Sequence, residues 1–266
     1  MPKANSIILN FDFCIMHKIY TGLVLKRISY KEADEVVSFW SWEEGKVRIL
    51  ARGAKRSTSK LKAILQPLAW LAVTAVKSDF LPVLTSVRRI ASYPALAKRL
   101  DLTAGVFNLF EMVLRSTPDR QSNETVSVLL RESLEHLNRE KNFSLDFLNL
   151  FILRLLAALG YRQSWKNCSQ CGSKTIDRGE IFFSRLSFGA VCGRCGRVDF
   201  LAEKVDLRVK EYLVKLEKDG LAFKDGALGS KVSSLAEHFL SDVFNSVTER
   251  QLNSKKFLKE QLVTYA

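Results

Sequence analysis

Four of the five cysteines in this 266-residue chain have the spacing of a metal site. They form two C-x-x-C pairs, and the predicted ligand set is Cys168, Cys171, Cys192 and Cys195. Two residues between thiolates make a tight knuckle, and two such knuckles together supply the tetrahedral sulfur set that suits zinc. We therefore predict one structural zinc ion, because four sulfur ligands leave no open position for an activated water.

Two other uses of the cysteines stay open: an iron–sulfur or redox role, and free thiols. Disulfide bonds are disfavoured in a cytosolic chain, and a redox pair needs only one C-x-x-C motif. A zinc ion bound by four thiolates carries a net negative charge, and the cations near it in sequence are Lys166, Arg185, Arg194 and Arg197. Cys14 stands alone and is expected to behave as a small buried hydrophobic residue.

The second candidate site is a basic segment, residues 46–62, which contains no acidic residue. Residues 1–100 hold 17 Lys/Arg against seven Asp/Glu, and the whole chain has a net charge of +13. An excess concentrated in one third of the chain predicts a polyanion-binding domain there. Gly53 and the segment Ser57-Thr58-Ser59 predict a flexible loop between two strands, and flexible cations can follow a phosphate backbone without reading bases. A solvated loop is the alternative, and the predicted DNA contacts are Arg48, Arg52, Lys55, Arg56, Lys60 and Lys62.

No catalytic motif is present in the sequence. The chain has no phosphate-binding glycine loop and no nucleophile elbow, and its three histidines are far apart. Adjacent carboxylates at Asp34-Glu35 and Glu43-Glu44 are predicted to be turn or surface residues. We therefore do not expect an enzyme.

The elements that must position these sites differ between the two parts of the chain. Strand-like alternation predicts five strands, at Ile19–Ile28, Glu35–Trp42, Lys46–Arg52, Leu68–Val76 and Leu81–Ile90. Five short strands suit a small closed barrel such as the OB-fold, although an SH3-like barrel fits the periodicity nearly as well. Burial is favoured for each aromatic residue that could stack on bases: Tyr20, Tyr30, Phe39, Trp40 and Trp42.

After Tyr93-Pro94 the hydrophobic period becomes helical. The predicted helices are 95–116, 122–141, 145–159, 207–218, 231–247 and 254–263, with Ser144 as the N-cap of the third and Gly160 as its C-terminal cap. Helices on both sides of the cysteine-rich segment predict a bundle with that segment mounted on it.

The predicted fold is therefore α+β with two domains: a five-stranded N-terminal OB-fold barrel, then an α-helical bundle that carries a four-cysteine zinc module. We expect an N-terminal extension at 1–18, the barrel at 19–92, the helical domain at 93–163 and 203–266, and the zinc insert at 164–202. The longest uncharged run, residues 63–76, is too short to span a bilayer. No signal peptide is recognisable, so a soluble cytoplasmic protein without membrane contact is expected.

Several short motifs together resemble the RecO family of DNA-repair proteins over about residues 20–200. In chain order they are Gly22-Leu23-Val24-Leu25, Glu44-Gly45-Lys46, Ala51-Arg52-Gly53-Ala54-Lys55-Arg56, Leu65-Gln66-Pro67, Leu155-Leu156-x-x-Leu159-Gly160-Tyr161 and Phe183-Ser184…Gly189-x-x-Cys192. Their combined order is more specific than any one motif. The C-terminal segment shares with the family its helical character but none of these motifs.

The resemblance implies an OB-fold, a helical domain and a zinc module in a bacterial cytoplasmic protein associated with the nucleoid. It implies binding of single- and double-stranded DNA, annealing of complementary strands, and loading of RecA, together with RecR, onto DNA coated by single-strand-binding protein. A zinc-ribbon and OB-fold protein that binds RNA or acts in transcription is the alternative. A structural scaffold whose charge serves only solubility is a third possibility.

One partner implied by the family is the acidic, apolar-ended C-terminal tail of single-strand-binding protein. Arg131 and Arg139 lie eight residues apart on a predicted helix and can border one groove. Val128, Leu129 and Leu137 would form its floor, and Arg115 and Arg120 are further candidates for its rim. Alternatively, these arginines only pair with Glu132, Glu135 and Glu140.

Overall fold

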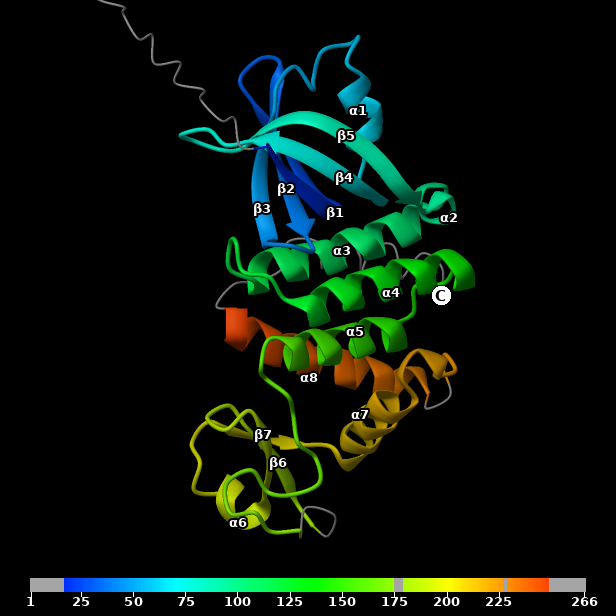
Figure 1. The fold of residues 1–266 in the computed structure, drawn as a ribbon. Coiled ribbons are helices and arrows are strands. Elements are labelled where there is room, and N and C mark those ends of the chain that lie inside the picture. Colours follow the sequence, from blue (N-terminus) through cyan, green and yellow to red (C-terminus); the bar gives the residue numbers. More distant parts are fainter. Residues whose placement is uncertain (1–16, 175–178, 227–228, 249–266) are drawn as a thin grey trace, which may run out of the picture.

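The computed structural model describes residues 17–174, 179–226 and 229–248. Cys14, most of the expected N-terminal extension and the expected helix at 254–263 lie outside these residues. The protein has three parts in a row, and Figure 1 shows a β-barrel at one end, a small sheet at the other and a layered helical body between them.

The N-terminal part is a closed barrel of five strands in the order β1-β2-β3-β5-β4. The strands are β1 (His17–Tyr30), β2 (Asp34–Ser41), β3 (Gly45–Ala51), β4 (Ala69–Val76) and β5 (Val83–Ser92). The long β1 pairs with β4 through its first half and with β2 through its second half. A parallel contact between Leu50 and Val83 joins β3 to β5. The five predicted strands are thus confirmed, with small shifts at their ends.

Alternation along β2 divides the aromatic residues between two cores. Phe39 points into the barrel, where it packs with residues such as Val47 and Leu71. Trp40 points outward and is fully buried against the helices, and its indole Nε1 donates a hydrogen bond to the Ser127 hydroxyl at 2.9 Å. Successive side chains of a strand point to opposite faces, so neighbours of the inward-facing residues point out of the barrel. Leu23, Trp40 and Trp70 do so and pack in the same cluster as the helical residues, which makes this outer face part of the main hydrophobic core.

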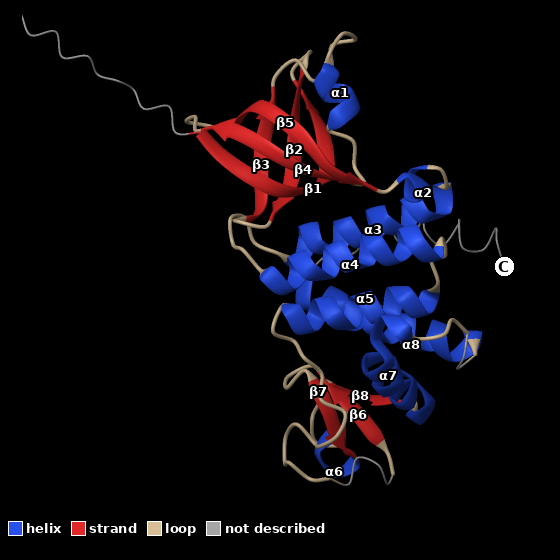
Figure 2. Ribbon diagram, turned by 45° about the vertical axis from the view of Figure 1, so that its right-hand side comes forward, coloured by secondary structure: helices blue, strands red, loops and turns tan. Residues whose placement is uncertain are grey.

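The body consists of α2 (Pro94–Ala97), α3 (Leu100–Ser116), α4 (Glu124–Glu140), α5 (Leu145–Ala158), α7 (Leu207–Asp219) and α8 (Ser230–Thr248), with a short 3-10 helix, η2 (Gly220–Ala222). In Figure 2, α3 and α4 lie nearest the barrel, and α5 and α8 form the next layer. Within the described residues, no helix is long and apolar enough to cross a membrane.

Two helix caps predicted for α5 are confirmed, and one helix prediction is wrong. The Ser144 hydroxyl accepts a hydrogen bond from the Phe147 amide at 3.1 Å, and Gly160 follows the helix with a φ of +93°. The single helix expected at 95–116 is instead two helices. Arg99 is extended at the start of α3, where its side chain bonds both Asp101 and the Lys141 carbonyl, so a local polar network interrupts the helical period.

Close contact between the β2–β3 turn and the α3–α4 connection seats the barrel on the body. The Lys46 ammonium donates hydrogen bonds to the carbonyls of Leu114 at 2.8 Å and Thr117 at 2.6 Å. Gly45 has a φ of +68°, and a Cβ there would lie 2.0 Å from the Gln121 carbonyl oxygen. Only glycine allows this approach, which fixes the barrel against the helices.

The cysteine module combines the Cys168–Cys171 segment with β6 (Ile181–Ser184), β7 (Gly189–Cys192), the single-turn α6 (Gly193–Gly196) and β8 (Ala202–Val205). Its sheet has the order β7-β6-β8. The rings of Trp165 and Phe183 pack on Phe239 of α8, with centroid distances of 5.9 and 5.1 Å. This aromatic cluster makes the module continuous with the helical core.

Candidate metal centre and nucleic-acid interface

The four predicted cysteine ligands come together in the cysteine module. Their sulfur atoms all lie within 4.8 Å of one another, and the Sγ atoms of Cys171 and Cys192 are 3.9 Å apart. Gly172 closes the first knuckle: it has a φ of +72°, and its amide donates to the Cys168 carbonyl at 2.8 Å. The second knuckle begins at the end of β7 and continues into α6. These residues are close enough to bind one metal ion.

The electrostatics of the four thiols suit a bound cation. Burial disfavours the Cys168 thiolate, but backbone amides of Cys192, Cys171 and Gln170 lower the pKa of Cys168 to about 6. Burial and the neighbouring sulfur atoms raise the pKa of Cys195 to about 12. One negative charge is therefore easily held among four crowded sulfur atoms, whereas several charges need a cation to offset their repulsion.

One of the four cations near the cysteines in sequence stands at the sulfur cluster. A hydrogen bond to Cys171 and the charges of the other sulfur atoms raise the pKa of the Arg194 guanidinium. Arg185 instead pairs with Glu203 at 2.6 Å, and Arg197 pairs with Glu180 at 3.0 Å. Of the four cations expected to offset the negative charge of the thiolates, Arg194 is therefore the one that interacts with the sulfur atoms. Lys166 is exposed.

The structure divides the basic segment into two groups. Lys46 and Arg48 lie on β3 and both form ion pairs with Asp119 of the α3–α4 connection, at 3.2 and 3.0 Å. The Lys46 side chain is largely buried, whereas that of Arg48 is 58% exposed. Lys46 therefore joins the barrel to the body. Arg48 is exposed, but a phosphate that binds it has to compete with Asp119 for its guanidinium.

The other predicted DNA contacts follow β3 at the barrel end away from the helices. We call them the barrel-end cations: Arg52, Lys55, Arg56, Lys60 and Lys62. All five are exposed, and among the described residues none of them forms an ion pair. Lys60 and Lys62 lie on a short helix, α1 (Lys60–Ile64), where a flexible loop was expected. Figure 1 shows α1 on the far side of the barrel from the helical body.

Contacts from the barrel wall hold α1 in place. The Arg27 guanidinium pairs with Glu35 at 2.7 Å and also donates to the Leu65 carbonyl at 3.3 Å. Arg89 of β5 donates to the Ala63 carbonyl at 3.3 Å. The expectation of a flexible loop is therefore wrong for residues 60–64, since charged side chains from two strands bind backbone carbonyls of this segment.

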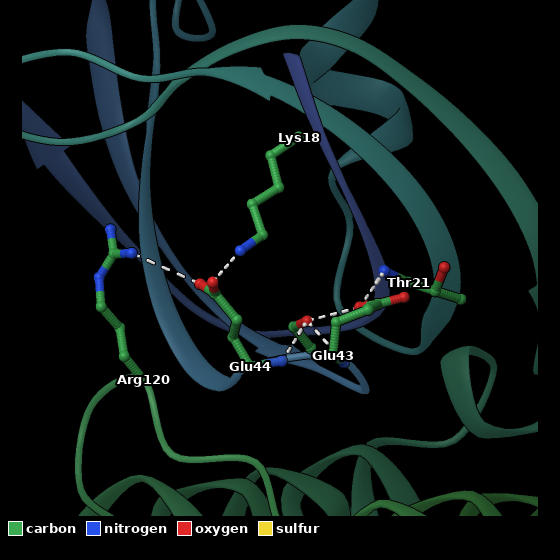
Figure 3. Close-up of polar contacts among 6 residues, drawn as sticks. Lys18, Thr21, Glu43, Glu44 and Arg120 are labelled. Atoms are coloured by element: carbon green, nitrogen blue, oxygen red, sulfur yellow. Dashed lines mark hydrogen bonds and ion pairs between the residues drawn. The ribbon is translucent and has the colours of Figure 1, made fainter. Parts of the chain in front are cut away.

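The carboxylate pair Glu43-Glu44 has structural partners, as Figure 3 shows. Glu44 accepts hydrogen bonds from Lys18 and, at 3.4 Å, from Arg120 of the α3–α4 connection. Glu43 accepts from the Thr21 amide at 2.9 Å and the Ser41 hydroxyl at 2.6 Å. Burial opposes ionisation of Glu43, but these hydrogen bonds outweigh it and lower its pKa. The pair thus fastens the β2–β3 turn.

Arg131 and Arg139, predicted to receive a partner's tail, are exposed on α4. Arg139 pairs with Glu140 at 2.8 Å, and the Arg131 guanidinium lies 5.6 Å from the centre of the Trp42 ring. Leu129 and Leu137 are buried in the main core, so the prediction that they form the floor of an open groove is wrong. Both leucines belong to the apolar stripe of α4, which is packed into the main core.

A buried polar network in the helical body was not predicted. Asp146, in the first turn of α5, is 6% exposed and accepts hydrogen bonds from Tyr212 at 2.7 Å, from the Gly226 amide at 2.9 Å and from Ser233. Burial raises the pKa of Tyr212 well above its ordinary value. The network joins α5, α7 and α8 beside a cavity of about 320 Å³. No local pattern marks it, since its members are far apart in sequence.

Comparisons with known proteins cover nearly all of this architecture. Residues 16–93 match the family model "Recombination protein O N terminal", and residues 97–254 match "Recombination protein O C terminal". The chain is similar to the DNA repair protein RecO of Listeria monocytogenes serotype 4b, with 26% identity over 90% of this chain and 92% of that protein.

Two further relatives carry the same name. The protein of Symbiobacterium thermophilum is 28% identical over 89% of this chain and 94% of its own length. That of an Exiguobacterium species is 29% identical over 91% of this chain and 95% of its own length. Because the two family models meet at the junction of barrel and helices and leave few residues unmatched, this chain belongs to the RecO family of DNA repair proteins.

Proposed function

We propose that this protein is a non-catalytic recombination mediator that binds single-stranded DNA, anneals complementary strands and helps RecR load RecA onto DNA coated by single-strand-binding protein. Membership of a DNA-repair family supports the biological setting. The observation that carries the DNA-binding part is the group of barrel-end cations, which are exposed and form no ion pair among the described residues. Their charge is therefore available to a polyanion.

We infer that the barrel is an OB-fold. The strand order β1-β2-β3-β5-β4, with β1 shared between β2 and β4, supports this assignment. OB-folds bind oligonucleotides on their strand faces and through the connections between strands. The barrel-end cations occupy the β3–β4 connection, so a nucleic acid backbone can run across this end of the barrel.

Annealing without ATP has a simple physical basis on such a surface. Two DNA strands repel each other through their phosphates, and each phosphate bound by a cation releases a condensed counterion. A cationic surface that binds both strands lowers this repulsion and raises their local concentration. Base pairing then supplies the sequence specificity, so the protein needs no base-reading side chain for this step.

We propose that the four cysteines bind zinc. The sulfur-only donor set, the C-x-x-C knuckles and their joint placement support a closed, tetrahedral, structural site. Zinc would supply cross-linking of the two knuckles, and Arg194 would offset part of the negative charge of the thiolates. Because the module packs on α8 through Phe239, the metal would also stabilise that side of the helical body.

We propose that the acidic tail of single-strand-binding protein binds α4 through Arg131 and Arg139. With Leu129 and Leu137 buried, the half-buried Trp42 ring beside Arg131 offers apolar surface for the end of the tail. The double variant Arg131→Ala/Arg139→Ala should lose affinity for a tail peptide while keeping its DNA binding. Equal peptide affinity for both proteins would place the tail elsewhere.

A salt titration of single-stranded DNA binding tests the main proposal. Replacing the five barrel-end cations by alanine should weaken binding to all sequences alike, and the slope of log affinity against log salt should shrink by about 0.7 for each phosphate that the variant no longer binds. A matched control replaces five exposed lysines elsewhere: Lys174, Lys215, Lys218, Lys224 and Lys231. The control should retain the wild-type slope.

Three results would contradict the proposal. If both quintuple variants lose the same affinity, only total charge matters and the barrel end is not a specific surface. If wild-type protein binds matched RNA much more tightly than DNA, or shows no salt-dependent binding to either, a recombination mediator is the wrong function. An annealing assay on complementary oligonucleotides, run with the same two variants, connects binding to activity.

A further inference from the structure

Two aromatic rings stack on each other at the surface of the barrel. Tyr30 ends β1, and Phe80 lies in the β4–β5 connection, 69% exposed. Their ring centroids are 6.1 Å apart with an interplanar angle of 21°. A large apolar ring that stays mostly in water contributes little to folding, and grouped exposed rings commonly mark a binding site.

This aromatic pair lies at the same end of the barrel as the barrel-end cations. Three hydrogen bonds donated by backbone amides show it. The Leu50 amide donates to the Pro82 carbonyl at 2.8 Å, which ties the end of β3 to the β4–β5 connection. The Gly53 amide donates to the Asp34 carboxylate at 2.8 Å, and the Lys55 amide donates to the Ala33 carbonyl at 2.9 Å.

These bonds bring together the β1–β2 turn, the β4–β5 connection and the segment after β3 that carries the first barrel-end cations. Arg52 and Lys55 therefore belong to the same barrel end as the Tyr30 and Phe80 rings. A further cation, Lys31, has its Nζ 5.5 Å from the centre of the Tyr30 ring. Stacked rings bordered by cations offer both a surface for a base and charges for the adjoining phosphates.

The other aromatic residues of the barrel do not offer such a surface. Tyr20, Phe39 and Trp40 are 2% exposed or less, and Trp42 is half-buried under Arg131 with its ring 6.5 Å from that of Trp70. Within the described part of the barrel, Phe80 is thus the most exposed of these rings, and Tyr30 stacks on one of its faces.

We propose that Phe80, backed by Tyr30, is a base-stacking site for single-stranded nucleic acid. An unpaired base stacks on the free face of Phe80, while phosphates on either side meet Arg52, Lys55 and Lys31. The inference rests on the proposed DNA binding and adds the residues that contact bases. Its place fits the fold, because connections between strands 1 and 2 and between strands 4 and 5 are the ones that OB-folds use for oligonucleotides.

This site distinguishes single strands from duplexes. A base within a duplex is covered on both faces by its neighbours, so it can stack on Phe80 only after leaving the helix, which costs free energy. Every base has a π face, so the contact tolerates any sequence. The cations supply affinity for any polyanion, and the rings add a preference for strands whose bases are free.

An abasic oligonucleotide separates base stacking from phosphate binding. Phe80→Ala should lower affinity for a base-bearing single strand by about 5- to 150-fold. It should leave unchanged both the affinity for an abasic strand of equal length and the salt dependence of binding. Phe80→Trp should retain the wild-type affinity. The matched control is Phe200→Ala, which removes a ring that is 87% exposed in the cysteine module and should have no effect.

The outcomes separate this site from the proposed function. If Phe80→Ala binds base-bearing strands as tightly as the wild type does, while the wild type shows salt-dependent binding, the stacking site is refuted and the proposed function stands. If the variant loses equal affinity for abasic and base-bearing strands, Phe80 acts through the phosphates or the fold and stacking is likewise refuted. A wild-type protein that binds neither strand refutes the proposed function itself.

Discussion

At the scale of single residues, identical side chains have different tasks because their surroundings differ. The Lys46 ammonium is enclosed by two carbonyls and Asp119 at the junction of barrel and helices. Lys55, nine residues further along, projects into solvent. Removing a buried donor leaves its acceptors unsatisfied, whereas removing an exposed one costs little.

This contrast predicts different effects on stability. Lys46→Ala should lower the free energy of unfolding by about 1–3 kcal/mol, because the Leu114 and Thr117 carbonyls lose their donor. Lys55→Ala should change it by less than about 0.5 kcal/mol. Urea unfolding measures both, and equal stability of the two variants would show that water replaces the Lys46 ammonium at no cost.

His136 makes the stability of the folded protein depend on pH. Burial lowers the pKa of its imidazole, Arg139 acts in the same direction, and Glu140 and Asp225 oppose them. The unfolded chain therefore binds a proton near pH 6.5 that the folded protein does not bind, so stability falls as the pH drops below that value. His136→Phe keeps the stacking on Phe147, now with a ring that cannot be protonated. Its unfolding free energy should fall less between pH 7 and pH 5 than that of the wild type.

At the scale of elements, local sequence determined much of the structure and long-range contacts determined the rest. The strands and most helices follow from their hydrophobic periods, and the ligand set follows from cysteine spacing, because these signals lie within a few residues. The break at Arg99 and the ordered α1 depend on partners such as Lys141 and Arg27, which are distant in sequence. The Tyr30–Phe80 pair likewise joins the end of β1 to the β4–β5 connection, which only the closed barrel brings together.

The cysteine module yields a prediction about metal. Protein purified without chelator should contain one zinc per chain, with zinc–sulfur distances near 2.3 Å. Cys171 is exposed, so Cys171→Ser removes a ligand without opening a core cavity. Its loss of metal should speed hydrogen exchange in the module and in the nearby part of α8 while the barrel keeps its protection. Unchanged exchange, or disulfides within the two knuckles, would contradict a structural zinc site.

At the scale of the whole molecule, barrel and helices share one core. Leu23, Leu25, Trp40 and Trp70 of the barrel pack in the same cluster as the helical residues. Figure 2 shows the barrel lying directly on α3 and α4. Domains joined through a large apolar contact are expected to move and unfold together.

Cooperative unfolding of the two parts is therefore expected. In a Trp165→Phe background, the remaining tryptophans, at positions 40, 42 and 70, report on the barrel and its contact with the helices. Their fluorescence and the far-UV circular dichroism of the helices should change at the same denaturant concentration. Trp40→Ala should move both curves together and cost about 3–5 kcal/mol. Separate transitions would mean that the barrel folds independently.

The outward-facing Trp40 also limits how this barrel can be reused. A barrel cut away after β5 would present Leu23, Leu25, Trp40 and Trp70 to water as one apolar patch. Patches of this kind drive self-association, so the excised fragment should precipitate or form oligomers at concentrations where the intact chain stays monodisperse. Grafting the proposed nucleic-acid-binding end onto another scaffold requires either polar replacements on that face or the transfer of α3 and α4 with it.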